Sequence, residues 1–527
     1  MATDISLRID PEIASTPEKL RLRIAKEIGV DLMKVNDYKI VRRSVDARQK
    51  NVIVNLTVRV ALDEEKEVKA VYEPIRFKKL SDGAQTLVIV GAGPAGLFAA
   101  LKAIELGIRP VVLERGTDVE SRRIELAKIS REGTVNPNTN YCFGEGGAGA
   151  YSDGKLFTRS KKRGNIASIL QILHQHGASD DILIDAHPHI GSDRLPGIIK
   201  NIRQTILDSG GDVKFNTQVT GILLDGDKAI GVETSSGERF HGAVVLATGH
   251  SARDVYRFLN KQDIDINAKS LAMGVRLEHP QQLIDRIQYH NKKGRGKYLP
   301  AAEYSFVTQI DGRGVYSFCM CPGGVVVPAM SDNGQSVVNG MSASARASQW
   351  ANSGIVVELH PGDIPGFAAY GDLEMLYLQE SLESKFFQSS AESINAPAQR
   401  MKDFVDGKKS ESLPRSSYSP GIHSDRLDSL LPPQISKRLK EAFKIFDRKS
   451  HGFLTNDAVL IGLESRTSSP IRIPREPSTL EHIRINNLYP AGEGAGYAGG
   501  IVSAAIDGQR CVEAYYSKNN KIDGNNS

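Results

Sequence analysis

Cysteine and tryptophan are scarce in this sequence, which has four cysteines and one tryptophan among 527 residues. Four cysteines are too few for the dense disulfide framework of a small secreted domain. Because the sequence also shows no signal-peptide pattern, a reducing, cytoplasmic location is expected. CxxC pairs and a matching histidine pair are missing as well, so no metal site is predicted.

A strong charge of one sign and a long uninterrupted apolar run are also missing. Lys and Arg number 67 against 62 Asp and Glu, a formal net charge of +5. Nucleic-acid binding requires clustered positive charge, so nucleic acid is not the expected partner. Glycines, Lys102 and Glu105 interrupt the apolar stretch between residues 87 and 108, so no membrane span is predicted. The length favours roughly two to four domains.

The first 80 residues are predicted to form a small β-α-β-β unit. Residues 5–9 alternate like a strand, Thr16 and Pro17 begin a helix that should end at Gly29, and two further alternating runs cover 38–45 and 52–60. Four basic residues could form a nucleic-acid face: Arg42, Arg43, Arg48 and Lys50. Without aromatic residues beside them, the solvated side of a sheet is the preferred interpretation.

A glycine-rich turn follows the first continuous apolar run. Residues 87–90 predict a strand buried on both faces, and residues 91–96 (Gly-Ala-Gly-Pro-Ala-Gly) begin a helix that should extend to 107. A second buried strand over 110–113 ends at Glu114 and Arg115. This order of strand, turn, helix, strand and acid is that of a dinucleotide-binding unit.

Each residue type in this turn has a physical role. Gly91 permits the tight turn, Gly93 allows the backbone to approach a pyrophosphate, and Gly96 allows close packing of helix and strand. Pro94 and Ala95 begin the helix, whose N-terminus attracts phosphate. Glu114 can accept hydrogen bonds from ribose hydroxyls and disfavours a 2′-phosphate, so the site suits FAD or NAD rather than NADP.

Two later segments favour FAD over NAD. Short strands that include Val219 precede a buried run over 243–247, which ends at Thr248 and Gly249. Near the C-terminus, Gly492 and Glu493 precede Gly500, Ile501 and a predicted helix over 501–517. These segments resemble the two-dinucleotide-domain flavoproteins, and that resemblance implies that Glu493 binds the ribityl chain of FAD. No second nucleotide-binding unit is found, and no covalent attachment sequence is present.

A third glycine cluster lies in the middle of this region, over residues 141–156. Its backbone N–H groups at Gly144, Gly146, Gly147 and Ser152 could cradle phosphates or the flavin ring, although a flexible surface loop is the alternative. Together with residues 317–324 and 462–473, this loop resembles an uncharacterised bacterial family of FAD-dependent dehydrogenases, or NAD(P)/FAD-dependent oxidoreductases. The resemblance spans nearly the whole chain and implies the cofactor, but no substrate.

The predicted fold class is α/β, with a Rossmann-like FAD-binding domain, an inserted α+β cap domain and the small N-terminal domain. The expected boundaries are 1–80 for the N-terminal domain, 86–255 and 485–518 for the two parts of the FAD-binding domain, 256–484 for the cap, and 519–527 for a disordered tail.

Three side chains are candidates for the substrate pocket. Arg276 and Arg466 could hold an anionic substrate, although a structural ion pair is an equal alternative for each. His279 could donate a proton near neutral pH, although a structural histidine is more common. Cys319 and Cys321 could exchange electrons with a flavin, but a small buried cysteine pair is the preferred interpretation.

The predicted function is an FAD-dependent oxidoreductase that acts on a small molecule. Hydride or electrons would come from a substrate bound under the cap, or from NAD(P)H that docks transiently. Two alternatives stay open. The first is a flavin-dependent RNA-modifying or RNA-associated protein, and the second is a non-catalytic flavin-binding sensor. The oligomeric state is not predicted.

Overall fold

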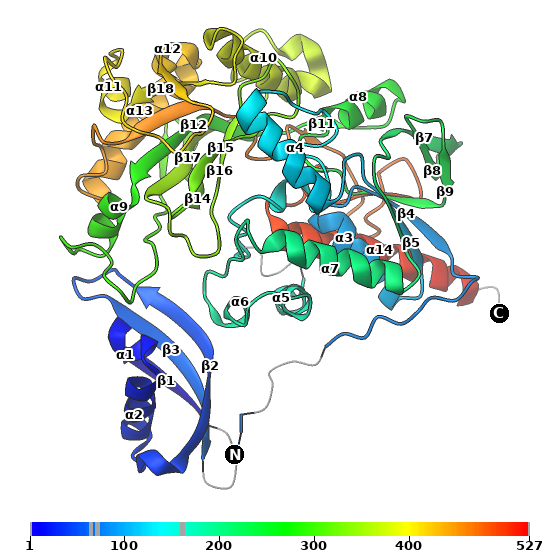
Figure 1. The fold of residues 1–527 in the computed structure, drawn as a ribbon. Helices are drawn as coiled ribbons and strands as arrows, with labels where there is room; N and C mark the ends of the chain where they lie inside the picture. Colours follow the sequence, from blue (N-terminus) through cyan, green and yellow to red (C-terminus); the bar gives the residue numbers. More distant parts are fainter. Residues whose placement is uncertain (1–2, 63–66, 69–73, 159–163, 525–527) are drawn as a thin grey trace.

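The computed structural model describes residues 3–62, 67–68, 74–158 and 164–524. Three sheets organise these residues (Figure 1): a three-stranded sheet near the N-terminus, a five-stranded parallel sheet, and a seven-stranded mixed sheet. The protein is therefore a mixed α/β protein built around a parallel sheet.

The N-terminal unit is a sheet of order β1-β3-β2 covered by a helix. Its elements are β1 (Thr3–Ile9), α1 (Pro11–Ser15), α2 (Pro17–Ile28), η1 (Leu32–Lys34), β2 (Val35–Asp46) and β3 (Ile53–Leu62). Leu7, Leu20, Ile24 and Val58 form its core. Helix α2 ends at Gly29, whose φ of 71° favours glycine. The short helix α1 was not anticipated, because five residues are too few to show helical periodicity.

Arg43 holds this unit against the following domain. Its guanidinium pairs with Asp185 at 2.6 Å and with Asp181 at 2.8 Å, beside α6 (Asp181–Ile184). Arg48 pairs with Asp46 at 2.7 Å. Two of the four basic residues considered for nucleic-acid binding are therefore engaged in ion pairs within the chain.

The parallel sheet has the order β22-β10-β4-β5-β6. Its strands are β4 (Thr86–Val90), β5 (Arg109–Leu113), β6 (Asp212–Lys214), β10 (Ala243–Leu246) and β22 (Leu488–Pro490). Alternate residues of β4 enter different cores: Ile89 contributes to one cluster and Val88 to another. The strand is thus buried on both faces, as its continuous apolar sequence indicates.

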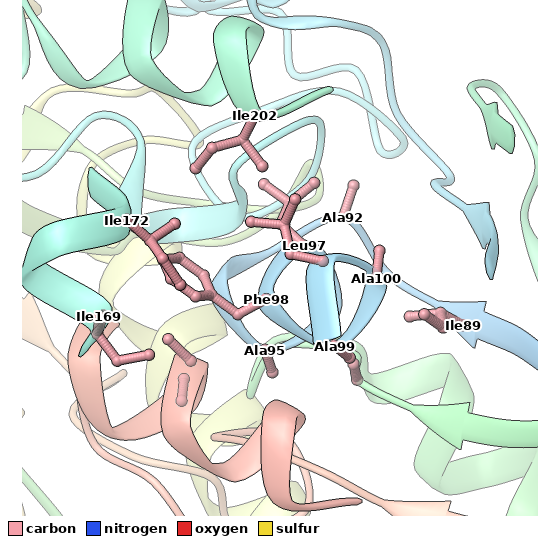
Figure 2. Close-up of a cluster of buried hydrophobic side chains, with 14 of the residues drawn as sticks. Ile89, Ala92, Ala95, Leu97, Phe98, Ala99, Ala100, Ile169, Ile172 and Ile202 are labelled. Carbon is pink, nitrogen blue, oxygen red and sulfur yellow. The ribbon is translucent and has the colours of Figure 1, made fainter. Parts of the chain in front are cut away.

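Helices cover one face of this sheet. They are α3 (Pro94–Glu105), α5 (Ile166–Gln175), α7 (Leu195–Asp208) and α14 (Ile501–Gly524). Figure 2 shows Phe98 of α3 directed toward Ile172 of α5 and Ile202 of α7 near Leu97, all in one apolar cluster. The other face carries the small sheet β7 (Val219–Asp225), β8 (Lys228–Thr234) and β9 (Arg239–His241) together with α8 (Arg253–Lys261).

The seven-stranded sheet lies between β10 and β22 in the chain. Its order is β13 (Val307–Ile310), β14 (Arg313–Cys321), β17 (Trp350–Leu359), β12 (Leu271–Pro280), β20 (Val459–Glu464), β18 (Ala396–Arg400) and β19 (Ile422–Ser424). Its neighbours pair antiparallel except β18 and β19. Phe386 of α10 (Glu374–Ser389) and Phe443 of α13 (Pro433–Lys449) pack on it.

The remaining elements lie around these sheets and include two two-stranded sheets, β11-β21 and β15-β16. They are α4 (Val119–Glu132), η2 (Gly147–Gly149), β11 (Asn267–Ala268), α9 (Gln281–Gln288), β15 (Val325–Pro328), β16 (Val338–Met341), η3 (Ala368–Leu373), α11 (Met401–Asp406), α12 (Leu427–Leu430) and β21 (Ile471–Arg472). Within the described ranges, no helix has both the length and the apolar character needed to cross a membrane.

Helix α14 is longer than the sequence analysis expected. It continues to Gly524, whereas the prediction ended it near 517 and placed a disordered tail at 519–527. Lys518, just beyond the predicted end of the helix, pairs with Glu481 at 2.7 Å, a long-range contact that the local sequence does not indicate. Residues 525–527 of that predicted tail lie outside the described residues.

Candidate cofactor and substrate cavity

A cavity of about 370 Å³ opens at the carboxyl ends of the parallel strands, within the usual size range of ligand pockets. The ends of β4, β5 and β10, the glycine loop 142–155 and the start of α14 line one side of it. Phe318, Cys319 and Asn339, together with Arg466 and Thr467 just beyond β20, line another side. The cavity therefore joins the dinucleotide-type sheet to the seven-stranded sheet.

Two positions of the first glycine turn, Gly91 and Gly96, have no room for a side chain. Gly91 has a φ of +105°, and a Cβ added there would lie 2.7 Å from the carbonyl oxygen of Ala247. A Cβ on Gly96 would lie 1.9 Å from the carbonyl oxygen of Gly91. This contact brings α3 against β4 and leaves the helix N-terminus, at Gly93 and Pro94, facing the cavity.

Glu114 organises the backbone at the end of β5. Its two carboxylate oxygens accept hydrogen bonds from the N–H groups of Ala92 at 2.9 Å, Gly116 at 2.9 Å and Gly144 at 3.0 Å. The side chain is 5% exposed and still lines the cavity. Because each carboxylate oxygen has more than one acceptor site, Glu114 retains capacity for a ribose hydroxyl.

The middle glycine loop is held in place by a buried arginine that sequence reasoning missed. Arg122 of α4 is 0% exposed and donates to the carbonyl oxygens of Asn140, Gly144, Glu145 and Gly147 at 2.7–3.2 Å. The loop is thus a fixed wall of the cavity rather than a loose surface segment. No signal in the sequence separates this arginine from its charged neighbours in α4.

The start of α14 forms the opposite end of the cavity. Gly500 and Gly249 have open space where a side chain would project. The Thr248 hydroxyl is buried and has no hydrogen-bond partner among the described residues. Burial raises the pKa of Glu493 to about 7, while the nearby Lys269 ammonium partly opposes that shift. These groups leave unsatisfied hydrogen-bonding capacity directed toward a ligand.

Most of the predicted cofactor residues come together around this cavity. The lining includes Gly91, Gly93, Pro94, Ala95, Glu114, Arg115, Gly144, Gly147, Ser152, Val219, Thr248, Gly249, Glu493, Gly500 and Ile501. Three predicted residues are not part of the cavity lining: Gly96, Gly146 and Gly492. A Cβ on Gly146 would lie 2.4 Å from Ile199 Cδ1, and one on Gly492 would lie 2.8 Å from Ala95 Cβ, so these glycines permit close packing.

Arg115 is fixed beside Glu114, just after the end of β5. It pairs with Asp254 at 2.8 Å, and its guanidinium lies 4.3 Å from the centre of the Phe143 ring. Asp254 also accepts from Gln218 at 2.9 Å. The positive charge is therefore balanced within the protein.

Arg466 lines the cavity but is neutralised by a structural ion pair. Its guanidinium lies 3.0 Å from Glu383 and donates to Ser331 at 2.7 Å and to Gln335 at 2.6 Å. Glu383 pairs with Arg253 as well, at 2.8 Å. Of the two alternatives weighed for Arg466, the geometry favours the ion pair, which joins α8, α10 and the segment after β20.

The other two substrate candidates lie outside the cavity. Arg276 is 0% exposed, pairs with Glu464 at 3.2 Å and donates to Asn352 at 2.9 Å. His279 is 0% exposed, bonds to the carbonyl oxygen of Phe453 at 2.9 Å and packs against its ring. Strand β12 is buried on both of its faces, so its alternation did not indicate a face toward substrate.

Lys155 and His250 are among the titratable side chains of the lining that sequence reasoning missed. Lys155 has its ammonium 3.4 Å from Asp153, at the end of the middle glycine loop. His250 follows Gly249 directly, and burial with the nearby Arg466 and Arg253 lowers its pKa to about 4. Position next to a glycine motif was the signal that could have identified both.

Sequence comparison relates this chain to other proteins over nearly its whole length. An uncharacterised protein of Clostridium beijerinckii is 40% identical over 98% of both chains. The chain belongs to that protein's family. Residues 270–467 match the family described as "FAD-dependent protein, C-terminal domain-like", and residues 1–61 match a domain of unknown function. The first of these descriptions supports FAD as the cofactor and a flavoprotein as the class.

Solved structures show only a distant likeness. A geranylgeranyl bacteriochlorophyll reductase-like protein from Thermoplasma acidophilum is 13% identical, with 84% of this chain and 80% of that chain covered and a TM-score of 0.34. CtdE in complex with FAD is 10% identical, with 82% of this chain and 84% of that chain covered and a TM-score of 0.33. The flavin-dependent brominase Bmp2 is 14% identical, with 82% of this chain and 78% of that chain covered and a TM-score of 0.36. TM-scores this low carry no conclusion about this chain.

The cavity residues fit an FAD molecule. Two helix N-termini face the cavity, at Pro94 and Ile501, and each can bind phosphate or negative charge on a ring. The glycines between them leave the backbone open, and Thr248 presents a buried hydroxyl without a partner among the described residues. Within those residues, no group of three or more His, Cys, Asp or Glu side chains could hold a metal ion.

Proposed function

We propose that this protein is an FAD-dependent oxidoreductase that transfers a hydride or electrons between a small substrate and an acceptor. The supporting observation is that one cavity joins the glycine turn at Gly91–Gly93 to side chains of the seven-stranded sheet. A cofactor bound along the glycine turn would therefore lie next to apolar, polar and charged side chains, among them Phe318, Cys319 and Arg466. FAD supplies the redox chemistry when bound.

The chain's own residues would orient the reactants and stabilise charge. The N–H groups at the start of α3 would bind the pyrophosphate, and Glu114 would accept from a ribose hydroxyl. The start of α14 would stabilise negative charge that develops on the flavin ring. Glu493, with its raised pKa near 7, can hold or release a proton at that end.

NAD(P)H is proposed as a transient donor rather than a resident cofactor. Within the described residues, we find one unit of strand, glycine turn, helix, strand and acid, formed by β4, α3 and β5 and ending at Glu114. A nicotinamide would therefore have to enter the same cavity from the side of the seven-stranded sheet. A substrate oxidised directly by the flavin is the other source of electrons consistent with this geometry.

The visible absorption spectrum of the purified protein tests this proposal. Flavin bands are expected, and anaerobic NADH or NADPH should bleach them if a nicotinamide is the donor. Gly93→Trp should abolish flavin binding by filling the approach to the helix, whereas Gly83→Trp, in open space on an exposed turn, should not.

The outcomes separate the alternatives. Absence of flavin even after added FAD would overturn the proposal. Flavin that binds but is reduced neither by nicotinamides nor by dithionite would favour a binding protein without catalysis. Flavin that only dithionite reduces would keep FAD and remove NAD(P)H as the donor.

A further inference from the structure

Two cysteines lie at a distortion of the sheet that faces the cavity. Strand β14 carries a bulge between Phe318 and Cys321, where it pairs with β17. Cys319, inside this bulge, has a φ of 45°, in the left-handed region that non-glycine residues rarely adopt. Strained backbone of this kind is found disproportionately at functional sites.

The bulge separates the surroundings of the two thiols. Cys319 is partly exposed and lines the cavity, whereas Cys321 is fully buried behind it. Cys321 Sγ lies 3.4 Å from the carbonyl oxygen of Cys319. The side chains of Cys319 and Cys321 also hydrogen-bond to each other, so the two thiols are neighbours.

Two cations lie beside this pair, each with its own carboxylate: Arg276 with Glu464 at 3.2 Å and Lys155 with Asp153 at 3.4 Å. Arg276 Nη2 donates to the carbonyl oxygen of Cys319 at 2.8 Å and to Cys321 Sγ at 3.5 Å. A hydrogen bond from Cys321, supported by the charges of Lys155 and Arg276, lowers the pKa of Cys319, although burial opposes the shift. These contacts favour the Cys319 thiolate, which is the reactive form of a cysteine.

Cys319 also lies near the end of the cavity where α14 begins. It lines the same cavity as Glu493 and Ile501, and its negative charge contributes to the raised pKa of Glu493. The thiol is thus placed on the substrate side of the proposed flavin site, and not in the first dinucleotide unit.

We propose that Cys319 and Cys321 form a second redox centre that exchanges two electrons with the flavin. An S–S bond forms between Cys319 and Cys321 as the thiolate and the thiol together lose two electrons and one proton, which pass to oxidised FAD. The reverse transfer opens the disulfide. In this scheme Cys319 faces the cofactor, Cys321 completes the bond, and Arg276 is a positioning residue. The inference rests on the proposed FAD site and extends it.

Anaerobic reductive titration of the full-length holoenzyme tests the redox centre. The protein is first incubated with glutathione disulfide, freed of it, and titrated with dithionite. Two two-electron equivalents per FAD are expected for the wild type, and one for Cys319→Ser or Cys321→Ser. Cys511→Ser is the matched control, because this buried cysteine of α14 lies away from the cavity, and it should still take up two equivalents.

Alkylation and mass spectrometry provide a readout that does not depend on flavin. After incubation with glutathione disulfide, the segment with Cys319 and Cys321 should be lighter by two hydrogens and resist alkylation until reduced. One equivalent for the wild type, or thiols that stay free in that incubation, would overturn the redox centre. If the protein binds no FAD, the proposed function fails, and a Cys319–Cys321 disulfide detected by mass spectrometry would still support the pair itself.

Discussion

Glu114 Oε1 accepts a hydrogen bond from the backbone N–H of Gly144 at 3.0 Å, so the end of β5 is joined directly to the middle glycine loop. The same carboxylate binds the N–H of Ala92 in the first glycine turn. One buried side chain thus sets the spacing between two backbone segments that face the cavity.

Replacing Glu114 should therefore weaken both the loop and FAD binding. Glu114→Ala leaves three buried N–H groups without an acceptor, and a hydrogen bond to a charged group contributes about 1.5–3 kcal/mol. We expect FAD affinity to fall about tenfold or more, with a lower Tm, measured by flavin fluorescence and thermal unfolding. Glu120→Ala, in an exposed pair with Lys200, should change neither. Unchanged FAD affinity in Glu114→Ala would contradict this account.

The ion pairs of Glu383 should control the stability of the junction between α8 and α10. Glu383→Gln removes the carboxylate that pairs with buried Arg466 and leaves Arg253 with Glu380 alone, at 3.6 Å, and breaking a buried pair typically costs about 3–5 kcal/mol. Denaturant unfolding at neutral pH would measure that loss. Arg257→Gln is the control, because Arg257 forms a more exposed pair with Glu380 and should cost at most about 1 kcal/mol.

The contribution of Glu383 should disappear in acid. Although burial opposes the shift, Arg253 and Arg466 lower the pKa of Glu383 to about 2, from 4.5. A lowered carboxyl pKa stabilises the folded state above the unfolded pKa and is lost as the pH falls toward the folded value. The difference in unfolding free energy between wild type and Glu383→Gln should therefore shrink from pH 4.5 down to about 2. A difference that stays constant over this interval would show that Glu383 is not ionised in the fold.

His279→Phe should leave FAD binding and turnover unchanged, because His279 lies away from the cavity. Burial lowers its pKa to about 4, from 6.5, so the unfolded chain binds a proton more readily and the wild type loses stability as the pH falls from 6.5 to 4. Over that interval the unfolding free energy of the wild type falls by about 1.4 kcal/mol per pH unit because of His279, and the variant lacks this contribution. Unfolding curves at several pH values measure it, and comparison at each pH cancels the contribution of His250. Lost turnover with intact flavin binding would restore a catalytic role.

Gly96→Ala should prevent normal assembly of the first glycine turn. The added Cβ would lie 1.9 Å from the carbonyl oxygen of Gly91, and neither backbone can move alone. Overpacking of this kind typically costs about 1–3 kcal/mol or more, so lower Tm and loss of bound FAD are expected together. Gly83→Ala, with no atom near its Cβ, should behave like the wild type.

The cofactor side of the cavity was predictable because its determinants are local. The spacing of Gly91, Gly93 and Gly96 after a buried strand is dictated by one turn and one helix, and Glu114 follows at the end of the next strand. The role of Arg122 was not predictable in this way. Its partners are backbone carbonyls in a distant loop, and an arginine in a charged helix normally lies on the surface.

The seven-stranded sheet was less predictable because its pairing is long-range. The alternation over residues 273–280 indicated a strand, but β12 lies between β17 and β20 and is buried on both faces. Arg276 and His279 consequently lie inside the protein. The bulge that places Cys319 at the cavity depends on the register between β14 and β17, which no local pattern specifies.

The pairing of β10 with β22 has a consequence for the order of folding during synthesis. Val244 lies beside Leu488, yet the whole seven-stranded sheet is encoded between them. The edge of the parallel sheet at β10 therefore stays unpaired until the segment with β22 has left the ribosome. Contacts so distant in sequence form slowly, and an unpaired edge invites aggregation. A chain truncated before residue 488 would keep the first glycine turn but lack β22, so its parallel sheet would be one strand short.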